Sequence, residues 1–230
     1  MKKCRLFILF MFCASLAMAQ DVTQLIKKVK TKLELVDNYE ATGVMKTDIA
    51  FIKAPIGKIK IYFKKPNLFK IKKEGGISLL PKGGLSVNLS SLIASSNYTT
   101  IDAGVQDIGD KKLRVVKLLP NEETSDVVIS TLYINEKESL IEKAITTTKE
   151  NGTYTMLMNY GAYSNYGLPD KVVFEFNTKN YKLPKGITLE FEDESKPLSA
   201  AQQLKNKKGR VEISYKNYSV NKGIPAAIFN

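Results

Sequence analysis

The sequence predicts a mainly β (α+β) fold, in which an antiparallel meander of strands follows one amphipathic helix. Three observations predict it: a stripe of apolar residues at helical spacing near the start, a proline corner between two alternating segments, and a long series of further alternating segments separated by turn residues. Residues 20–230 are enough for one sizeable hydrophobic core, and no linker or repeat divides them. We therefore expect one domain.

The start of the chain has the pattern of a secretory signal peptide. Three cations precede an apolar run at residues 6–16, and an Ala-Met-Ala triplet ends residues 1–19, which predicts cleavage after Ala19. Cys4 and Cys13, the only cysteines of the chain, both lie inside this leader. Neither directly follows the cleavage point, as a lipid-modified cysteine would, so we expect an exported, unanchored and periplasmic mature chain without disulfides.

The charge of the chain is strongly positive. The formal net charge is +12, and without the three cations of the leader 32 Lys and Arg remain against 23 Asp and Glu, a net charge of about +9. Lysines occur in most predicted strands, which fits a solvated lysine face, while a dedicated anionic partner is the alternative. Nucleic acid is not expected as a partner, because the protein is exported and its sequence has no clustered arginine stripe.

The opening helix is predicted over Asp21–Val36. Its lysines lie off an apolar stripe, and Asp21 or Thr23 is a suitable N-cap. Such a basic helix can lie on a membrane surface, but packing against a sheet is the commoner arrangement. The stripe consists of Val22, Leu25, Ile26, Val29, Leu33 and Val36.

The proline corner lies within residues 58–73, where lysines alternate with large apolar residues. One predicted strand ends at Pro66, which has no N–H for a β-ladder, and Pro66-Asn67 is a turn sequence before a second strand begins. Lys65 has the same inward parity as the apolar set of the first strand, so a cation should lie at the rim of an apolar interior. The inward apolar set is Ile59, Ile61 and Phe63 on the first strand and Phe69 and Ile71 on the second.

The six residues Lys64-Lys65-Pro66-Asn67-Leu68-Phe69 resemble the Lys-Arg-Pro-Asn-Leu-Phe corner of LolA-like periplasmic lipoprotein carriers. The order of an opening helix, a long strand and this corner is also that of the family. The resemblance implies a half-open antiparallel β-barrel whose apolar interior, covered by a short helical lid, accepts lipoprotein acyl chains. Lys65 stands where the family has an arginine that bonds to the lid, although lysine lacks the fork of donors of arginine.

Between residues 74 and 97, glycine-bearing loops flank an apolar, serine-rich run. We expect short helical turns over residues 88–94, which the resemblance would make the lid, and the alternative is a loop that plugs one end of the barrel. A short helix is predicted over residues 197–205, and Asn151-Gly152 predicts a two-residue type I′ hairpin turn. The other predicted strands are Tyr39–Lys53, Thr99–Ala103, Lys112–Leu119, Val127–Ile134, Leu140–Lys149, Tyr154–Tyr160, Val172–Asn177, Ile187–Phe191 and Arg210–Val220.

The residues that would carry chemistry are mostly missing. The sequence has no histidine, and no cysteine after processing, which removes the commonest general base, the thiol nucleophile and the usual transition-metal ligands. The densest carboxylate cluster, at residues 190–194, lacks the spacing of a calcium loop. We therefore expect no enzyme, no metal and no cofactor.

Together with the resemblance, these observations predict a monomeric carrier that shields the acyl chains of a lipoprotein or a phospholipid during delivery to the outer membrane, with transient contact to transfer machinery in both membranes. The alternative is an envelope-stress regulatory domain that senses lipid or lipoprotein on the same fold. Lys65 is the expected rim or lid contact. Alternation alone also fits an ordinary core, but the expected hollow is lined by Ile59, Ile61, Phe63, Phe69, Ile71, Leu89, Leu92, Ile93, Met156, Met158, Phe174 and Phe176.

Overall fold

The computed structural model describes residues 22–48, 56–66, 68–73, 93, 97–150, 152–177 and 208–229. The predicted signal peptide, the predicted strand at residues 187–191 and the predicted helix at residues 197–205 lie outside these residues. So does the predicted lid, including Leu89 and Leu92, apart from Ile93.

The N-terminal helix, described over residues 22–34, is amphipathic as predicted. Val22, Leu25 and Val29 are buried, whereas Lys27 and Lys28 are exposed. The helix ends in a tight last turn, in which the amide of Val36 donates to the carbonyl of Leu33 at 3.3 Å. No helix within the described ranges combines the length and the hydropathy needed to span a bilayer.

The described strands agree closely with the predicted ones. Each predicted strand that falls on described residues is present, with its described ends shifted by a few residues, because hydrogen bonding rather than side-chain alternation sets the limits. Residues 49–53 of the predicted strand Tyr39–Lys53 lie outside the described residues. The strands are β1 (Asn38–Asp48), β2 (Gly57–Lys64), β3 (Leu68–Lys73), β4 (Tyr98–Ile108), β5 (Lys111–Pro120), β6 (Val127–Asn135), β7 (Leu140–Thr148), β8 (Gly152–Asn159), β9 (Lys171–Asn177) and β10 (Lys208–Val220), with short 3₁₀ turns η1 (Ser164–Tyr166) and η3 (Ala226–Ile228).

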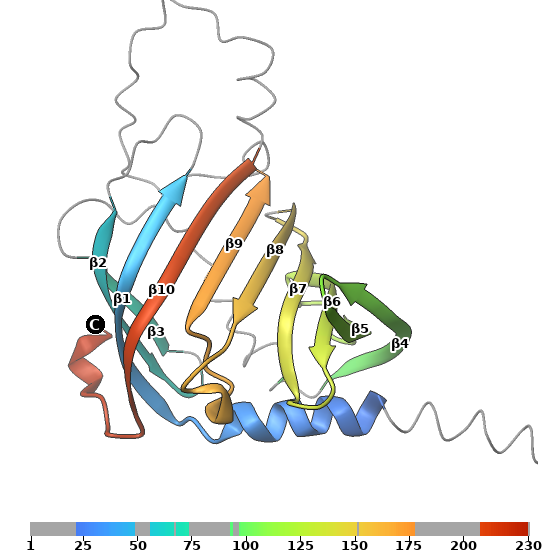
Figure 1. Ribbon diagram of the computed structural model, residues 1–230, viewed down its shortest axis with the longest axis horizontal. Coiled ribbons are helices and arrows are strands. Elements are labelled where there is room, and N and C mark those ends of the chain that lie inside the picture. Colours follow the sequence, from blue (N-terminus) through green and yellow to red (C-terminus); the bar gives the residue numbers. More distant parts are fainter. Residues whose placement is uncertain are drawn as a thin grey trace, which may run out of the picture.

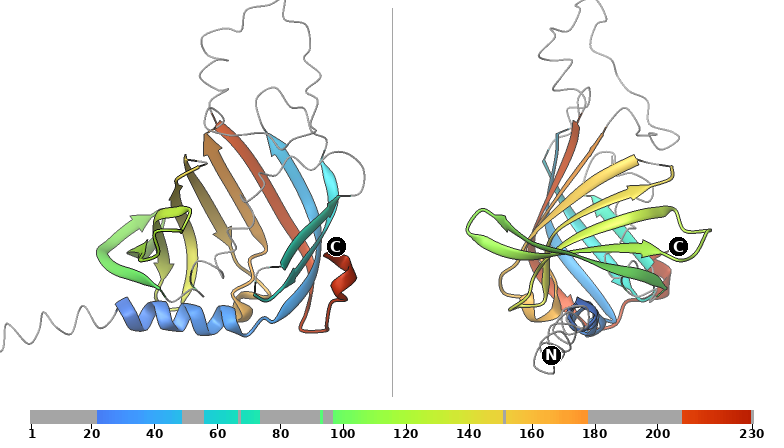
Figure 2. Two further views of the ribbon diagram at one scale, coloured as in Figure 1. Left: turned by 180° about the vertical axis from the view of Figure 1, so that it is seen from behind. Right: turned by 90° about the vertical axis from the view of Figure 1, so that its right-hand side faces the viewer.

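All ten strands belong to one antiparallel sheet, in the order β3-β2-β1-β10-β9-β8-β7-β6-β5-β4. The chain runs as two meanders, β1 to β3 and β4 to β9, and the last strand joins them by pairing with both β1 and β9. The sheet curves strongly, and its edge strands β3 and β4 do not pair with each other (Figures 1 and 2). The predicted half-open antiparallel barrel is therefore confirmed.

The core fills the inner face of the sheet and is covered at one end by the N-terminal helix (Figure 1). Register explains its continuity across strands: Met156 of β8 lies opposite Phe174 of β9, which lies opposite Val211 of β10. Met158 and Val172 form the next pair along the same face. The shared faces that the alternation of β8 and β9 predicts are thus confirmed.

Tyr62 corrects the simple alternation of β2. Alternation with Ile61 and Phe63 predicts that Tyr62 lies on the solvated face with Lys58 and Lys60, yet only 7% of its surface is exposed. Its ring lies beneath the ammonium group of Lys72, which stands 5.6 Å from the ring centroid. Long lysine stems can cover an aromatic ring while their charges stay in water.

The connection between β7 and β8 differs from the predicted two-residue turn. Thr148 pairs with Gly152, so Gly152, with φ of 68°, is the first residue of β8 and the connection is longer than the predicted two-residue turn. A tertiary contact accompanies the longer connection. The amide of Lys149 donates to the carbonyl of Asp126 at 2.8 Å, which ties this connection to the loop before β6.

Candidate ligand-binding hollow

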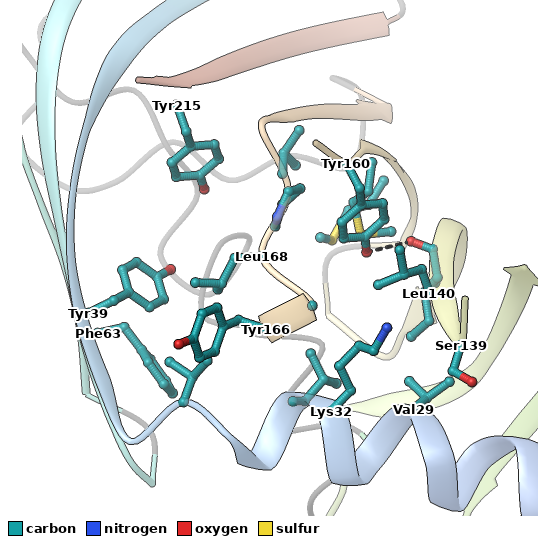
Figure 3. A pocket seen from close by; sticks show the side chains of 18 of the residues that line it. Val29, Lys32, Tyr39, Phe63, Ser139, Leu140, Tyr160, Tyr166, Leu168 and Tyr215 are labelled. Carbon is teal, nitrogen blue, oxygen red and sulfur yellow. Dashed lines mark hydrogen bonds between the residues drawn. The ribbon is translucent and has the colours of Figure 1, made fainter. Parts of the chain in front are cut away.

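A cavity of about 100 Å³ lies between the N-terminal helix and the inner face of the sheet (Figure 3). This volume is several times what one buried water needs. Side chains from the helix, from the β2–β3 corner and from the far strands meet around it. The lining residues are Val29, Lys32, Leu33, Val36, Tyr39, Phe63, Phe69, Ser139, Leu140, Ile141, Met156, Met158, Tyr160, Tyr166, Gly167, Leu168, Pro169, Val172 and Tyr215.

Helical periodicity supplies one wall of the cavity. Val29, Lys32, Leu33 and Val36 follow one another at intervals of three, one and three residues, which places them on one face of the helix. Val29 and Val36 are buried, and Leu33 packs against the core. This wall is therefore apolar except at Lys32.

The proline corner supplies the adjoining wall. Phe63 and Phe69 pair directly across the β2–β3 hairpin, so their side chains lie on the same face of the sheet, toward the cavity. Phe63 also lies against Tyr39 of β1, with ring centroids 5.4 Å apart. The Lys65–Pro66 peptide bond at the corner is cis.

The segment after β8 closes the cavity near the helix. Gly167 has φ of 66°, the left-handed region that glycine adopts without strain, and a Cβ atom there would lie 3.1 Å from Leu33. The absence of a side chain lets this segment approach the helix closely. Leu168, which is buried, then turns into the cavity (Figure 3).

Four of the six polar side chains that line the cavity are tyrosines. The hydroxyls of Tyr39 and Tyr215 point into the cavity (Figure 3), and that of Tyr160 donates to the carbonyl of Ile141 at 2.8 Å. Burial raises the pKa of Tyr39, Tyr160 and Tyr215 above the ordinary value of tyrosine, so these hydroxyls are neutral near neutral pH. Neutral hydroxyls can donate hydrogen bonds to ester or acid oxygens of a bound molecule.

Lys32 connects the helix to the opposite rim. Its ammonium group donates to the carbonyl of Glu138 in the β6–β7 turn, next to Ser139, which lines the cavity with φ of 53°. Lys32 thus closes one side of the hollow.

Lys65 fixes the C-terminal end of the helix from the side of the proline corner. Its ammonium group donates to the carbonyl of Glu34 at 2.7 Å and forms an ion pair of 3.0 Å with Asp37. A cation at the last carbonyls of a helix satisfies an otherwise unpaired acceptor and interacts favourably with the helix dipole. Contact between Lys65 and the predicted lid stays a prediction, because the lid lies outside the described residues.

We expect Lys65→Ala to lower the free energy of unfolding by about 1 kcal/mol or less, because this ion pair is largely exposed to solvent. The end of the helix next to the cavity should loosen, so amide hydrogen exchange should accelerate there and bound acyl probe should leave faster. Lys64→Ala is the control, because Lys64 is the neighbouring residue and lies on the outer face of β2. Equal release rates in both variants would show that Lys65 does not fix the helix.

The structure divides the predicted hollow residues into two groups. Phe63, Phe69, Met156 and Met158 line the cavity. The other described members lie in the surrounding core, and Ile71 is partly buried there. These core members are Ile59, Ile61, Ile71, Ile93, Phe174 and Phe176.

Sequence reasoning missed the polar lining residues Lys32, Tyr39, Ser139 and Tyr215. Lys32 lies next to Leu33 at the edge of the apolar helical stripe. This position indicates a lining residue only if the end of the sheet is known to face that edge of the helix. Alternation does place Tyr160 on the face of Tyr154, Met156 and Met158, but the predicted hollow includes only the two methionines of that face.

The described residues contain no group of three or more acidic, histidine or cysteine side chains that could hold a metal ion. The polar groups around the cavity are instead hydroxyls and one ammonium group. This set suits binding of an amphipathic molecule, with hydrogen bonds to its polar end and apolar contacts along its chain.

No protein-family profile and no curated protein sequence matches this chain. Solved structures do match its fold. A DUF1329 family protein from Desulfovibrio piger has a TM-score of 0.54 at 10% identity, over 91% of this chain and 97% of that one. An outer membrane lipoprotein-sorting domain, so named, from Vibrio parahaemolyticus has a TM-score of 0.52 at 10% identity, over 92% and 97%.

A LolA superfamily protein from Nitrosomonas europaea also has a TM-score of 0.52 at 10% identity, over 91% of this chain and 97% of that one. Nearly the whole of each chain is covered, so the likeness includes the helix and both meanders rather than the proline corner alone. The fold implied by residues 64–69 is therefore confirmed, and this chain has the LolA-like fold.

Proposed function

We propose that this protein is a non-catalytic carrier, which shields acyl chains of a lipoprotein or a lipid in the cavity between the N-terminal helix and the sheet. The observation that supports the proposal most is the composition of the lining, where aromatic, methionine and aliphatic side chains surround a few tyrosine hydroxyls. An acyl chain with an ester or acid group has the complementary chemistry.

The energetics fit a carrier that must also release its cargo. Each buried methylene contributes about 0.8 kcal/mol, so a partly inserted chain offsets much of the cost of leaving a membrane. A cavity of about 100 Å³ holds only a segment of a chain. Longer insertion requires Met156 and Met158 to change rotamer or the helix to move, and unbranched methionine side chains adapt readily. Transfer then follows relative affinity, from a weaker to a stronger acceptor.

The predicted signal peptide supports a periplasmic location in a diderm bacterium, between an inner membrane that would supply acylated molecules and an outer membrane that would receive them. The carrier would work as a monomer, with transient contact to transfer machinery at both membranes. The LolA-like fold of the lipoprotein-sorting neighbour supports the class of function, and the cavity supports the class of ligand.

Mass spectrometry of material that co-purifies with the mature protein tests the proposal. We expect acylated lipoprotein or phospholipid, and we expect a fluorescent fatty-acyl probe to bind and to be displaced by that material. A co-purified regulatory protein, with no acyl-probe binding, would instead support the sensor alternative. Purified protein that contains no acylated molecule and binds no acyl probe would refute the carrier.

A further inference from the structure

The outer face of the β2–β3 hairpin carries exposed lysines. Alternation directs Ile59, Ile61 and Ile71 to the core, so Lys58, Lys60 and Lys72 point the other way, and all three are exposed. We call Lys58, Lys60 and Lys72, together with the neighbouring exposed residues Ile56 and Leu68, the lysine face.

Register brings two of these charges together. Lys60 lies directly opposite Lys72 in the β2–β3 ladder, so their Cβ atoms are about 5 Å apart on the same face. Like charges in this position destabilise a sheet. Within the described part of the chain none of the three lysines forms an ion pair, and the contact recorded for Lys72 is the ring of Tyr62.

Several cations elsewhere on the sheet are paired with carboxylates. Lys111 contacts Glu142 at 2.9 Å, Lys171 contacts Glu212 at 2.7 Å, and Arg210 contacts Glu175 at 2.9 Å. Each of these pairs joins different strands, so the fold readily accommodates cross-strand carboxylate partners. Lys112 and Lys117 of β5 are exposed without an ion pair among the described residues as well, but on the lysine face two cations stand directly opposite each other without a carboxylate. An anionic partner from outside the chain would supply the counter-charge there.

Exposed apolar side chains border the lysines. Ile56, two residues before Lys58, is 66% exposed, and Leu68, opposite Lys64, is 43% exposed. Cations mixed with exposed aliphatic groups suit the interface of an anionic bilayer, where charges meet lipid head groups and apolar groups enter below them. Lysine is a compact point charge without a planar fork of donors, so it matches a diffuse anionic surface better than one defined anion.

We propose that the lysine face binds the surface of an anionic phospholipid bilayer and holds the protein there peripherally. Phe63 and Phe69 line the cavity from the opposite face of the same hairpin. The hairpin therefore separates a surface-binding face from a ligand-binding face, and contact with the bilayer leaves the inner face of the hairpin free for cargo.

Vesicle co-sedimentation of the mature protein tests this proposal. We expect binding to vesicles that contain phosphatidylglycerol, little binding to vesicles of phosphatidylcholine alone, and release as salt is raised. Each lysine near an anionic surface contributes about fivefold in affinity, so the triple variant K58Q/K60Q/K72Q should bind about 100-fold more weakly. Its thermal stability should change little, because removal of the repulsion between Lys60 and Lys72 offsets loss of the contact between Lys72 and the ring of Tyr62.

The matched control is K112Q/K117Q/K137Q, which changes the net charge equally at exposed lysines on β5 and in the β6–β7 turn. It should retain most of the binding. Equal losses in both triple variants would show that net charge, not the lysine face, controls binding. Absence of binding to phosphatidylglycerol vesicles at low salt would overturn the proposal, as would capture of an acidic protein by the lysine face without any binding to vesicles.

Discussion

Phe63→Ala is expected to weaken binding of a fluorescent acyl probe by tenfold or more, whereas Ile61→Ala should leave the affinity nearly unchanged. Both side chains are buried on the inner face of β2, two residues apart. Phe63 lines the cavity and Ile61 does not. Loss of the aromatic wall removes contacts worth about 1.5 to 3 kcal/mol for a fully buried ring, which corresponds to roughly tenfold to more than a hundredfold in affinity.

Stability should fall in both variants. A large-to-small change in a core costs about 3 to 5 kcal/mol for Phe→Ala and about 2 to 5 kcal/mol for Ile→Ala, so the two free energies of unfolding should be similar. Denaturant unfolding measures the shared loss, and probe titration at low temperature measures the difference. If both variants lose affinity equally, the probe reports general loosening of the fold. If neither does, the probe binds elsewhere.

Sequence alternation predicted which face of β2, β3, β8 and β9 is buried, because that face depends on local geometry. It did not predict which buried residues line a cavity. Ile61 and Phe63 share the same alternation, but the cavity beside the helix and the turn after β8 is lined by Phe63 and not by Ile61. This cavity depends on the curvature of a sheet closed by strands far apart in the sequence.

The pairing of β10 shows a second limit of sequence reasoning. Alternation from Ile213 places Tyr215 inside and Tyr218 outside, yet both face the core, with stacked rings 5.0 Å apart. A bulge opposite Thr42 and Gly43 shifts the register and reverses the alternation. A Cβ atom on Gly43 would lie 2.5 Å from the carbonyl oxygen of Ser214, so glycine permits this close approach of the two strands. The sequence alone does not predict the bulge from this glycine, because the bulge depends on which strand pairs with β1.

The tyrosines around this bulge and the hollow lead to a prediction at alkaline pH. Burial is the main cause that raises the pKa of five of them above the ordinary value of about 10. Three of these tyrosines line the cavity next to the helix, and the other two lie in the adjoining core on β8 and β10. The five are Tyr39, Tyr154, Tyr160, Tyr215 and Tyr218.

The direction of the change in stability follows from the number of protons that each state binds. Above about pH 10 the unfolded chain loses these protons while the folded chain keeps them, so the unfolded state binds fewer protons and stability falls as pH rises. Each tyrosine contributes a loss of about 1.4 kcal/mol per pH unit, and five contribute about 7. Because domains are typically stable by about 5 to 15 kcal/mol, we expect cooperative unfolding within one to two units above pH 10, with full stability below it.

Circular dichroism and the ultraviolet absorbance of tyrosinate should change together in this titration. Tyr154→Phe and Tyr160→Phe form a matched pair, because each removes one buried hydroxyl and should reduce the alkaline slope by about 1.4 kcal/mol per pH unit. At neutral pH they should differ. Tyr160 donates to the carbonyl of Ile141, so its loss costs about 1 kcal/mol.

The hydroxyl of Tyr154 is buried and makes no hydrogen bond of ordinary geometry in the part of the chain that the structure describes. Burial raises the pKa of Tyr154 and its neighbour Thr146 lowers it by a smaller amount, but the Thr146 hydroxyl is bonded to Ser130 at 2.7 Å. Tyr154→Phe should therefore be neutral or stabilising at neutral pH, since it removes a polar group that gains nothing from burial. Tyrosinate absorbance that rises near pH 10 while the circular dichroism stays native would mean that these hydroxyls reach solvent in the folded protein. The apolar hollow built around them would then be open to water.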